Sequence, residues 1–210
     1  MADINHWYQV LKQYNSATSV ELPSWTNIYY EHQPPSYWKI LGELLIKELK
    51  DCTIFEIGSG NGDILYLLWK LGFKRILGVE RDEQLWLSAK KKLSYLCPHN
   101  TPQIIFGSWP NIEQQDIDIL VRVNCVYPFQ ENENKHNYME NMSRYHSTKT
   151  MYLEFVDASF EQPHSAYPEA VRVSKVDVQQ AFLEFEIKRF QTYCYPKNSS
   201  TKYIYQLKKC

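Results

Sequence analysis

The chain has 210 residues, of which 44% are hydrophobic and 22% charged, a composition typical of folded proteins and not of disordered ones. This length suits one domain, so we expect a single domain over residues 1–210. The formal net charge of −1 gives no overall attraction to phosphate backbones or anionic lipid, which disfavours nucleic acid and membrane as partners.

The five cysteines are odd in number and show no C-x-x-C spacing, so the sequence predicts neither a disulfide framework nor a zinc knuckle. The first residues lack the basic start and apolar run of a signal peptide, and no run of about 18 apolar residues occurs. We therefore expect a soluble protein of the reducing cytoplasm.

Residues 1–36 are polar, tyrosine-rich and interrupted by prolines, which predicts a short helix followed by loops. From Tyr37 to Lys50, apolar residues recur at three- and four-residue spacing and predict an amphipathic helix that begins the core, residues 37–210. The predicted buried positions of this helix are Trp38, Leu41, Leu45 and Leu49.

A strand, helix and strand follow in close succession. "CTIFEIG" predicts a strand that ends in glycine, "DILYLLWKLGF" a helix closed by Gly72, and "RILGVE" a second strand. Brief connections between such elements are typical of a right-handed parallel crossover.

The rest of the chain continues this alternation. "DEQLWLSAKKKLSYL" predicts a helix whose lysines 90–92 form a solvated face, followed by strands at "QIIFGSW" and "DIDILVRVNCVYPF". A helix over about 132–145, a strand at "TMYLEFVD", an irregular loop over 158–170 and a helix near 176–182 come next. "FLEFEIKRFQTY" and "TKYIYQLKK" alternate like two antiparallel strands. The predicted fold class is α/β: an open, mostly parallel seven-stranded sheet flanked by helices, with a C-terminal antiparallel hairpin.

Three of the seven glycines fall within five residues, Gly58, Gly60 and Gly62, after the first strand. In an open parallel sheet this loop lies where ligands bind, and glycine tolerates both a tight turn and close approach. The third glycine of the dinucleotide fingerprint G-x-G-x-x-G would stand at Asp63. Glu56 and Asp63 are poor neighbours for a pyrophosphate and suit a cation, and Glu80, 18 residues beyond Gly62, can accept ribose hydroxyls.

"FEIGSGNG" followed by "GVERD" resembles the nucleotide-binding signature of class I S-adenosylmethionine-dependent methyltransferases of the small-molecule type. The resemblance implies S-adenosylmethionine as cofactor, with Glu56 on the methionine ammonium and Glu80 on the ribose. It also implies adenine contacts from Ser108 and Trp109 at the end of the third strand, where the family's usual carboxylate is missing. The cofactor residues implied are Tyr29, Tyr30, Glu56, Gly58, Ser59, Gly60, Gly62, Glu80, Arg81, Ser108, Trp109 and Asn124.

The substrate side is less defined. The segment "NCVYPF" after the fourth strand differs from the Asn/Asp-Pro-Pro-Tyr/Phe motif of adenine-N6 and glutamine methyltransferases. The fifth strand ends at Asp157-Ala158, without the Asp-Asn pair of the magnesium-dependent catechol enzymes. No two histidines have the i, i+4 spacing of a zinc site, so we expect no metal.

Catalytic candidates come from the aromatic N-terminal segment and from the later loops. Tyr29, Tyr30 and Trp38 are lid candidates, and His32 is a candidate base; ordinary surface packing is the alternative for each. Tyr127 and His136 are further substrate-side candidates, and Glu154 is a weaker one; a structural polar role is the alternative for each of these.

The sequence thus predicts methyl transfer to a nitrogen or oxygen of a small molecule. Nitrogen is slightly favoured because aromatic side chains hold cationic amines by cation–π attraction. Two other functions stay open: a methyltransferase-like binding subunit without catalysis, and a nicotinamide-dependent oxidoreductase.

Overall fold

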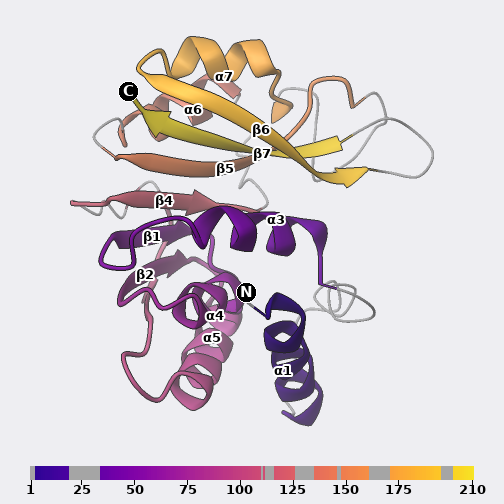
Figure 1. Cartoon of the computed structure of the whole chain (residues 1–210), viewed down its shortest axis with the longest axis vertical. Coiled ribbons are helices and arrows are strands. Elements are labelled where there is room, and N and C mark those ends of the chain that lie inside the picture. The colour runs from indigo at the N-terminus through magenta and orange to yellow at the C-terminus, as the bar shows by residue number, and fades with distance from the viewer. Residues whose placement is uncertain are drawn as a thin grey trace. The chain divides into compact units, whose positions relative to one another are not determined.

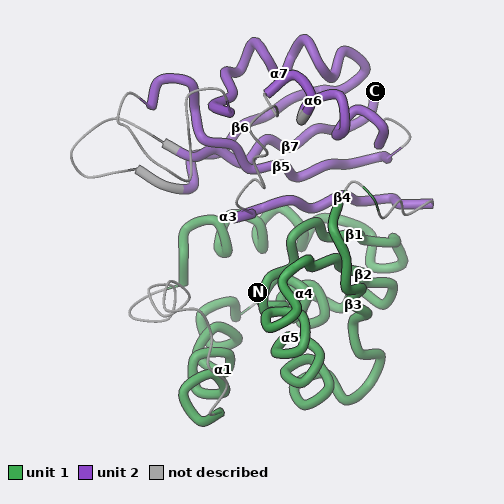
Figure 2. The backbone as a smooth tube through the Cα atoms, turned by 180° about the vertical axis from the view of Figure 1, so that it is seen from behind, with its two compact units in different colours: residues 1–114 green, residues 115–210 purple. Residues whose placement is uncertain are grey.

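The computed structural model describes residues 3–18, 34–109, 111, 116–125, 135–145, 148–160, 171–194 and 201–210. Two compact units, residues 1–114 and 115–210, divide the chain (Figure 2).

Unit 1 begins with two helices, α1 (Ile4–Ala17) and α3 (Ser36–Leu45) (Figure 1). They approach closely at Gly42, where a Cβ atom would lie 2.6 Å from the side chain of Ile4. The ring of Tyr8 meets that of Trp38 edge-on at 5.4 Å, and Trp38 is only 1% exposed. The lid role predicted for Trp38 is therefore wrong, because its side chain belongs to the core.

The helix predicted over residues 37–50 ends five residues early, at Leu45. The Lys50 ammonium donates hydrogen bonds to the carbonyl groups of Leu45 (2.8 Å) and Ile46 (3.2 Å), which satisfies two carbonyls at the helix end. Leu49 lies beyond this end and is 72% exposed, so its predicted burial is wrong.

The predicted strand, helix and strand are confirmed as β1 (Thr53–Ile57), α4 (Asp63–Lys70) and β2 (Arg75–Glu80). The two strands are parallel, with Thr53 opposite Arg75 and Ile57 opposite Val79. Gly72 has a φ of 92°, the left-handed conformation that commonly ends a helix at glycine.

Helix α5 (Glu83–Leu96) leads to β3 (Gln103–Phe106), which pairs in parallel with β2. The predicted solvated face is correct for Lys90 and Lys91, which are exposed. It is wrong for Lys92, which is fully buried and ion-paired with Asp63. The strand order in unit 1 is β3-β2-β1.

Unit 2 contains β4 (Ile119–Arg122), α6 (Lys135–Ser143), β5 (Thr150–Val156), α7 (Lys175–Ala181), β6 (Phe185–Cys194) and β7 (Thr201–Lys209). Strand β4 is parallel to β5, whereas β7 is antiparallel to both β5 and β6. The order in this unit is β4-β5-β7-β6 (Figure 1).

The fold class predicted from the sequence is confirmed: seven strands, mostly parallel, with a C-terminal antiparallel pair. Strand β4 is shorter than its predicted span of residues 116–129. The strand ends at Arg122, and it cannot extend through Asn124, whose positive φ of 53° is incompatible with extended backbone.

Candidate cofactor site

The glycine loop between β1 and α4 bends through left-handed backbone at all three of its glycines. Gly58, Gly60 and Gly62 have φ values of 71°, 53° and 83°, which side-chain-bearing residues rarely adopt. The amides of Gly58 and Ser59 both donate to the Val79 carbonyl oxygen at 3.0 Å, which fixes the loop to the end of β2. The bare backbone predicted here is therefore required by the turn itself.

The two later glycines differ in what surrounds them. A Cβ atom at Gly60 would meet nothing within 4 Å, so this position borders open space. A Cβ atom at Gly62 would lie 3.2 Å from both Ala89 and Leu93 of α5. The steric need for glycine at Gly62 thus comes from helix packing, whereas Gly60 leaves room beside the backbone for a ligand.

Glu56 on β1 is a buried carboxylate beneath this loop, and its residue is 1% exposed. Its Oε2 atom has no hydrogen-bond partner. Burial raises the pKa of Glu56 well above its ordinary value, and the negative charges of Asp63 and Glu80 raise it further, while a hydrogen bond from Ser59 opposes these effects. A cation at Oε2 would stabilise the ionised form and satisfy the unpaired oxygen.

The side chain of Ser59 points inward, away from open space. Its hydroxyl lies 3.4 Å from the Glu56 carbonyl oxygen, and a Cβ atom at Gly78 of β2 would collide with this hydroxyl. Gly78 therefore makes room for Ser59, and the Ser59 side chain supports the floor of the loop.

Glu80, at the end of β2, is held by three backbone amides. Its Oε2 accepts from Gly60 at 2.7 Å, and its Oε1 accepts from Arg81 and Asp82 at 2.9 Å each. A carboxylate offers about four acceptor positions, so roughly one remains for a ligand hydroxyl. Arg81 contributes its amide to this arrangement, and its side chain is exposed.

Asp63, the first residue of α4, is neutralised by Lys92, whose Nζ atom lies 2.5 Å from its carboxylate. The predicted use of Asp63 as an acidic neighbour for a cation is thus modified, because its charge is already paired. The other two carboxylates beside the loop are Glu56, which has one unpartnered oxygen, and Glu80, which is held by backbone amides.

The end of β3 is tied to the same place, since the Gly107 amide donates to the Glu80 carbonyl oxygen at 2.9 Å. Ser108 and Trp109 follow it and are half-buried. The ring of Phe106, which stands opposite Glu80 in the strand register and is 48% exposed, lies 5.3 Å from that of Trp86. The sequence pattern did not predict this aromatic pair, although Phe106 lies two residues before Ser108.

The candidates in unit 2 have a different character. The Asn124 amide donates to Glu154 Oε2 at 2.9 Å, the Thr192 hydroxyl contacts Oε1, and Arg122 donates to the Glu154 carbonyl oxygen at 3.3 Å. Glu154 is thus a buried group whose hydrogen bonds are satisfied, and it holds the backbone after β4 through Asn124. This agrees with the structural polar role that was the alternative to a substrate role for Glu154. His136 is exposed on α6.

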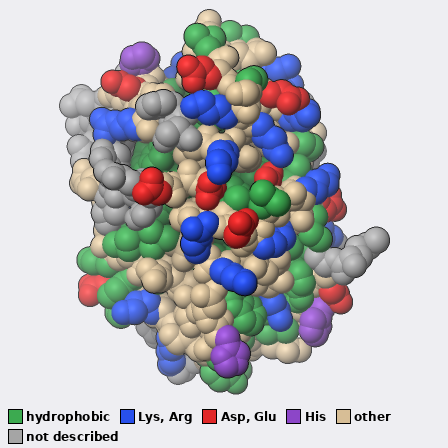
Figure 3. Space-filling view, turned by 60° about the vertical axis from the view of Figure 1, so that its left-hand side comes forward, with side chains coloured by type: hydrophobic (Ala, Val, Ile, Leu, Met, Phe, Trp, Pro, Cys, Tyr) green, Lys and Arg blue, Asp and Glu red, His purple; other side chains and the backbone are tan. Residues whose placement is uncertain are grey.

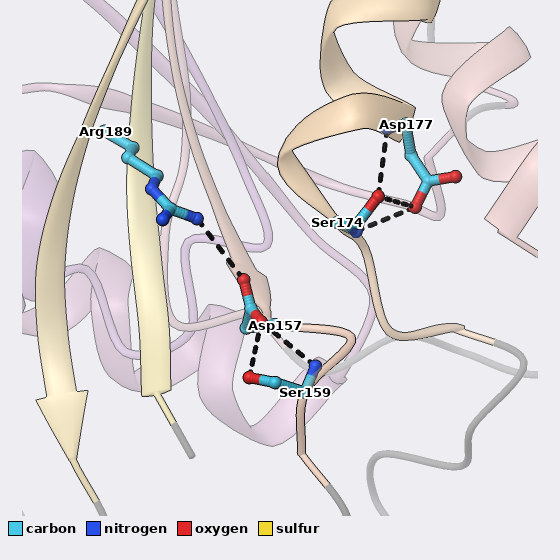
Figure 4. Close-up of polar contacts among 5 residues, drawn as sticks. All are labelled: Asp157, Ser159, Ser174, Asp177 and Arg189. Atoms are coloured by element: carbon cyan, nitrogen blue, oxygen red, sulfur yellow. Dashed lines mark hydrogen bonds and ion pairs between the residues drawn. The ribbon is translucent and has the colours of Figure 1, made fainter. Parts of the chain in front are cut away.

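Figure 4 shows two further sets of polar contacts in unit 2, one around Asp157 and one between Ser174 and Asp177. Asp157 accepts hydrogen bonds from the amide and hydroxyl of Ser159, at 3.0 and 2.6 Å, and Arg189 lies 3.6 Å from it. Ser174 and Asp177 form the capping box of α7. Within the residues that the structure describes, no three His, Cys, Asp or Glu side chains are grouped to hold a metal ion.

Four predicted residues, Tyr29, Tyr30, His32 and Tyr127, lie outside the described residues. No helix in the described part of the chain is long and apolar enough to cross a membrane.

No protein-family model matches the chain. The chain is similar in sequence to the ribosomal protein L11 methyltransferase of Clostridium perfringens, with 34% identity over 71 residues. These residues are 34% of this chain and 22% of that protein, so the chain spans about a fifth of the length of this curated relative.

Solved methyltransferases resemble the whole chain in structure. The magnesium protoporphyrin IX methyltransferase of Synechocystis, solved with bound SAH, matches with a TM-score of 0.67 at 15% identity over 96% of this chain and 99% of that one. A Pyrococcus horikoshii protein described as an RNA methyltransferase matches with a TM-score of 0.59 at 15% identity over 96% of each chain. The chain therefore has the class I methyltransferase fold.

Proposed function

We propose that this chain is an S-adenosylmethionine-dependent methyltransferase that holds its cofactor against the glycine loop of unit 1. The observation that carries the proposal is the Glu56 carboxylate, which is buried under left-handed backbone with one oxygen unpartnered. A buried ionised carboxylate without a partner is costly, so such a group suits a cationic ligand. The class I fold and the methyltransferase relatives support the same conclusion.

The residues present fit this cofactor. Glu56 would bind the methionine ammonium, and the free acceptor position on Glu80 would take a ribose hydroxyl. The open space beside Gly60 would admit the ligand close to the backbone, and Phe106 with Ser108 and Trp109 would flank the adenine. S-adenosylmethionine, when bound, supplies an electrophilic methyl group on a positively charged sulfur.

The role of the protein in such a reaction is to bind, orient and exclude water. Proximity and orientation lower a barrier by about 7 to 11 kcal/mol, so no covalent nucleophile is needed. A base is required only for an acceptor that must lose a proton, and His32, Tyr127 and His136 remain the candidates.

A nicotinamide dinucleotide fits less well. Its pyrophosphate would lie beside Glu56 and Glu80, and a carboxylate in its ionised form repels an anion strongly where water is excluded. The alternative of an oxidoreductase is therefore disfavoured by the same two side chains that favour a cation.

We propose a small molecule with a nitrogen or oxygen nucleophile as acceptor. The similar proteins are named for a porphyrin, RNA and a ribosomal protein, so the fold alone does not select a substrate. The net charge of −1, with acidic and basic side chains interspersed on the face that Figure 3 shows, gives little attraction to a nucleic acid.

Two measurements test this proposal. Calorimetric titration of the chain with S-adenosylmethionine and, separately, with NAD should show binding of the former alone. Transfer of labelled methyl should then be followed into a panel of amines and phenols, with RNA and ribosomal proteins as further arms. Label in an amine or phenol supports the proposal, and label in RNA or protein refutes the acceptor class. Binding without transfer to any arm favours the non-catalytic subunit, and binding of NAD alone overturns the proposal.

A further inference from the structure

A buried lysine lies next to the proposed cofactor loop, and nothing in the proposed reaction uses it. Lys92 of α5 is fully buried, and its ammonium pairs with Asp63, the residue that directly follows Gly62. Burying a lysine is costly and rare unless it is paired. Its location suggests a role in the adjacent loop.

We propose that Lys92 is a positioning residue for the cofactor loop: its ion pair with Asp63 holds the loop on α5 and cancels a negative charge beside Glu56. The proposal rests on the proposed function for the identity of the ligand, but its effects on the loop and on Glu56 are present without any ligand.

The geometric argument starts from the two ends of the loop. At the C-terminal end of the loop, Gly62 packs against Ala89 and Leu93, which flank Lys92 on α5. The ion pair between Lys92 and Asp63 therefore holds the same end of the loop against α5 as this packing does. Helix α5 also begins beside Glu80, because its N-cap residue, Asp82, donates its amide to Glu80. Helix α5 thus positions both the glycine loop and the carboxylate proposed to hold the ribose.

The electrostatic argument concerns three carboxylates that influence one another. The charges of Asp63 and Glu80 both raise the pKa of Glu56. The charge of Asp63 also acts on the buried phenol of Tyr8 on α1, whose pKa is raised chiefly by burial and secondarily by Asp63. With Lys92 in place, Asp63 is part of a neutral pair, so Glu56 is easier to ionise than it would be beside an unpaired Asp63.

The neighbouring lysines provide a matched control. Lys91 belongs to the same run and the same helix but is exposed. Lys91→Met and Lys92→Met remove the same charge and keep a chain of similar length, so their difference isolates the buried pair. Asp63→Asn/Lys92→Met removes both charges at once, which is often tolerated where removal of one partner is not.

The first test uses ligand-free protein. Hydrogen exchange should become faster in residues 58–63 of Lys92→Met and stay unchanged there in Lys91→Met. The midpoint of the Glu56 carboxyl titration, followed by ¹³C NMR, should lie at higher pH in Lys92→Met than in wild type. In the double variant the midpoint should return to the wild-type value or below.

If Lys92→Met does not fold, the comparison of the double variant with wild type decides. A Glu56 midpoint in the double variant well above that of wild type overturns the proposal. If Lys92→Met only lowers the melting temperature, with loop exchange and Glu56 titration like those of Lys91→Met, Lys92 is merely structural and the proposal is wrong.

The second test measures S-adenosylmethionine binding by calorimetry. Lys92→Met should bind S-adenosylmethionine about tenfold more weakly than wild type at pH 7, which is equivalent to about 1.4 kcal/mol. Lys91→Met should bind it like wild type. Equal affinities of the two variants would contradict the proposal. If wild type fails to bind at all, the proposed function is wrong, and the ligand-free measurements still decide the role of Lys92 in the loop.

Discussion

Replacing Glu56 by Gln should weaken cofactor binding and, at the same time, stabilise the ligand-free protein. The substitution keeps the size and shape of the side chain but removes its charge. In the structure, one oxygen of Glu56 is unpartnered, which corresponds to one charge-assisted hydrogen bond with a ligand ammonium. Such bonds contribute about 1.5 to 3 kcal/mol, so the Kd for S-adenosylmethionine should rise by about 10- to 150-fold.

The effect on stability follows from the raised pKa of Glu56. An acid whose pKa is higher in the folded than in the unfolded state destabilises the folded state progressively as pH rises from the unfolded to the folded pKa. Below the unfolded pKa this cost is absent. Glu56→Gln removes it, so the stability advantage of the variant should grow with pH by at most about 1.4 kcal/mol per pH unit across that window.

Urea unfolding of ligand-free protein at pH 4, 5, 6, 7 and 8 measures this advantage, and calorimetric titration measures the affinity. Glu43→Gln, an exposed position on α3, is the matched control and should change neither quantity. The reasoning is refuted if Glu56→Gln binds S-adenosylmethionine as tightly as wild type. It is also refuted if the stability difference between variant and wild type is the same at pH 4 and pH 8.

Three further substitutions test other parts of the structure. Glu80→Ala removes the acceptor of three backbone amides. It should weaken S-adenosylmethionine binding, measured by calorimetry, by about 1.5 to 3 kcal/mol. Unchanged affinity would show that Glu80 does not belong to the site. Gly62→Ala should lower the free energy of unfolding by more than Gly72→Ala does. Both substitutions strain a left-handed residue by about 1–2 kcal/mol, but only a Cβ atom at Gly62 would also press against α5. Equal losses in urea unfolding would contradict the packing argument. Thr192→Val deprives buried Glu154 of a partner and should cost about 1–3 kcal/mol in the same assay, whereas a change below 0.5 kcal/mol would show that the contact is dispensable.

Several features of the site were predictable because they depend on local sequence. Three glycines within five residues required left-handed backbone, and all three have it. Alternation of apolar strands and amphipathic helices with short links predicted the parallel pairing of β1 with β2. The spacing from Gly62 to Glu80 is set by one helix, one short turn and one strand, so the Glu80 carboxylate returns to the loop at Gly60.

Other features depend on partners that are distant in the chain. Lys92 looked like one of three solvated lysines, yet it lies on the same helical face as Leu85 and Ala89, a periodicity that would have placed it inward. Its partner, Asp63, is 29 residues away, so the ion pair was beyond local pattern. The inward orientation of the Ser59 side chain likewise depends on the space left by Gly78 on the neighbouring strand.

The sequence by itself determined the order of elements, the conformation of the glycine loop and the acidic residues that border it, because periodicity and backbone preference act over a few residues. Tertiary structure decided which of those acids is neutralised, which has an unpartnered oxygen and which is held by amides. These outcomes depend on burial and on charges brought together from separate elements, and neither is encoded in any short stretch of the chain.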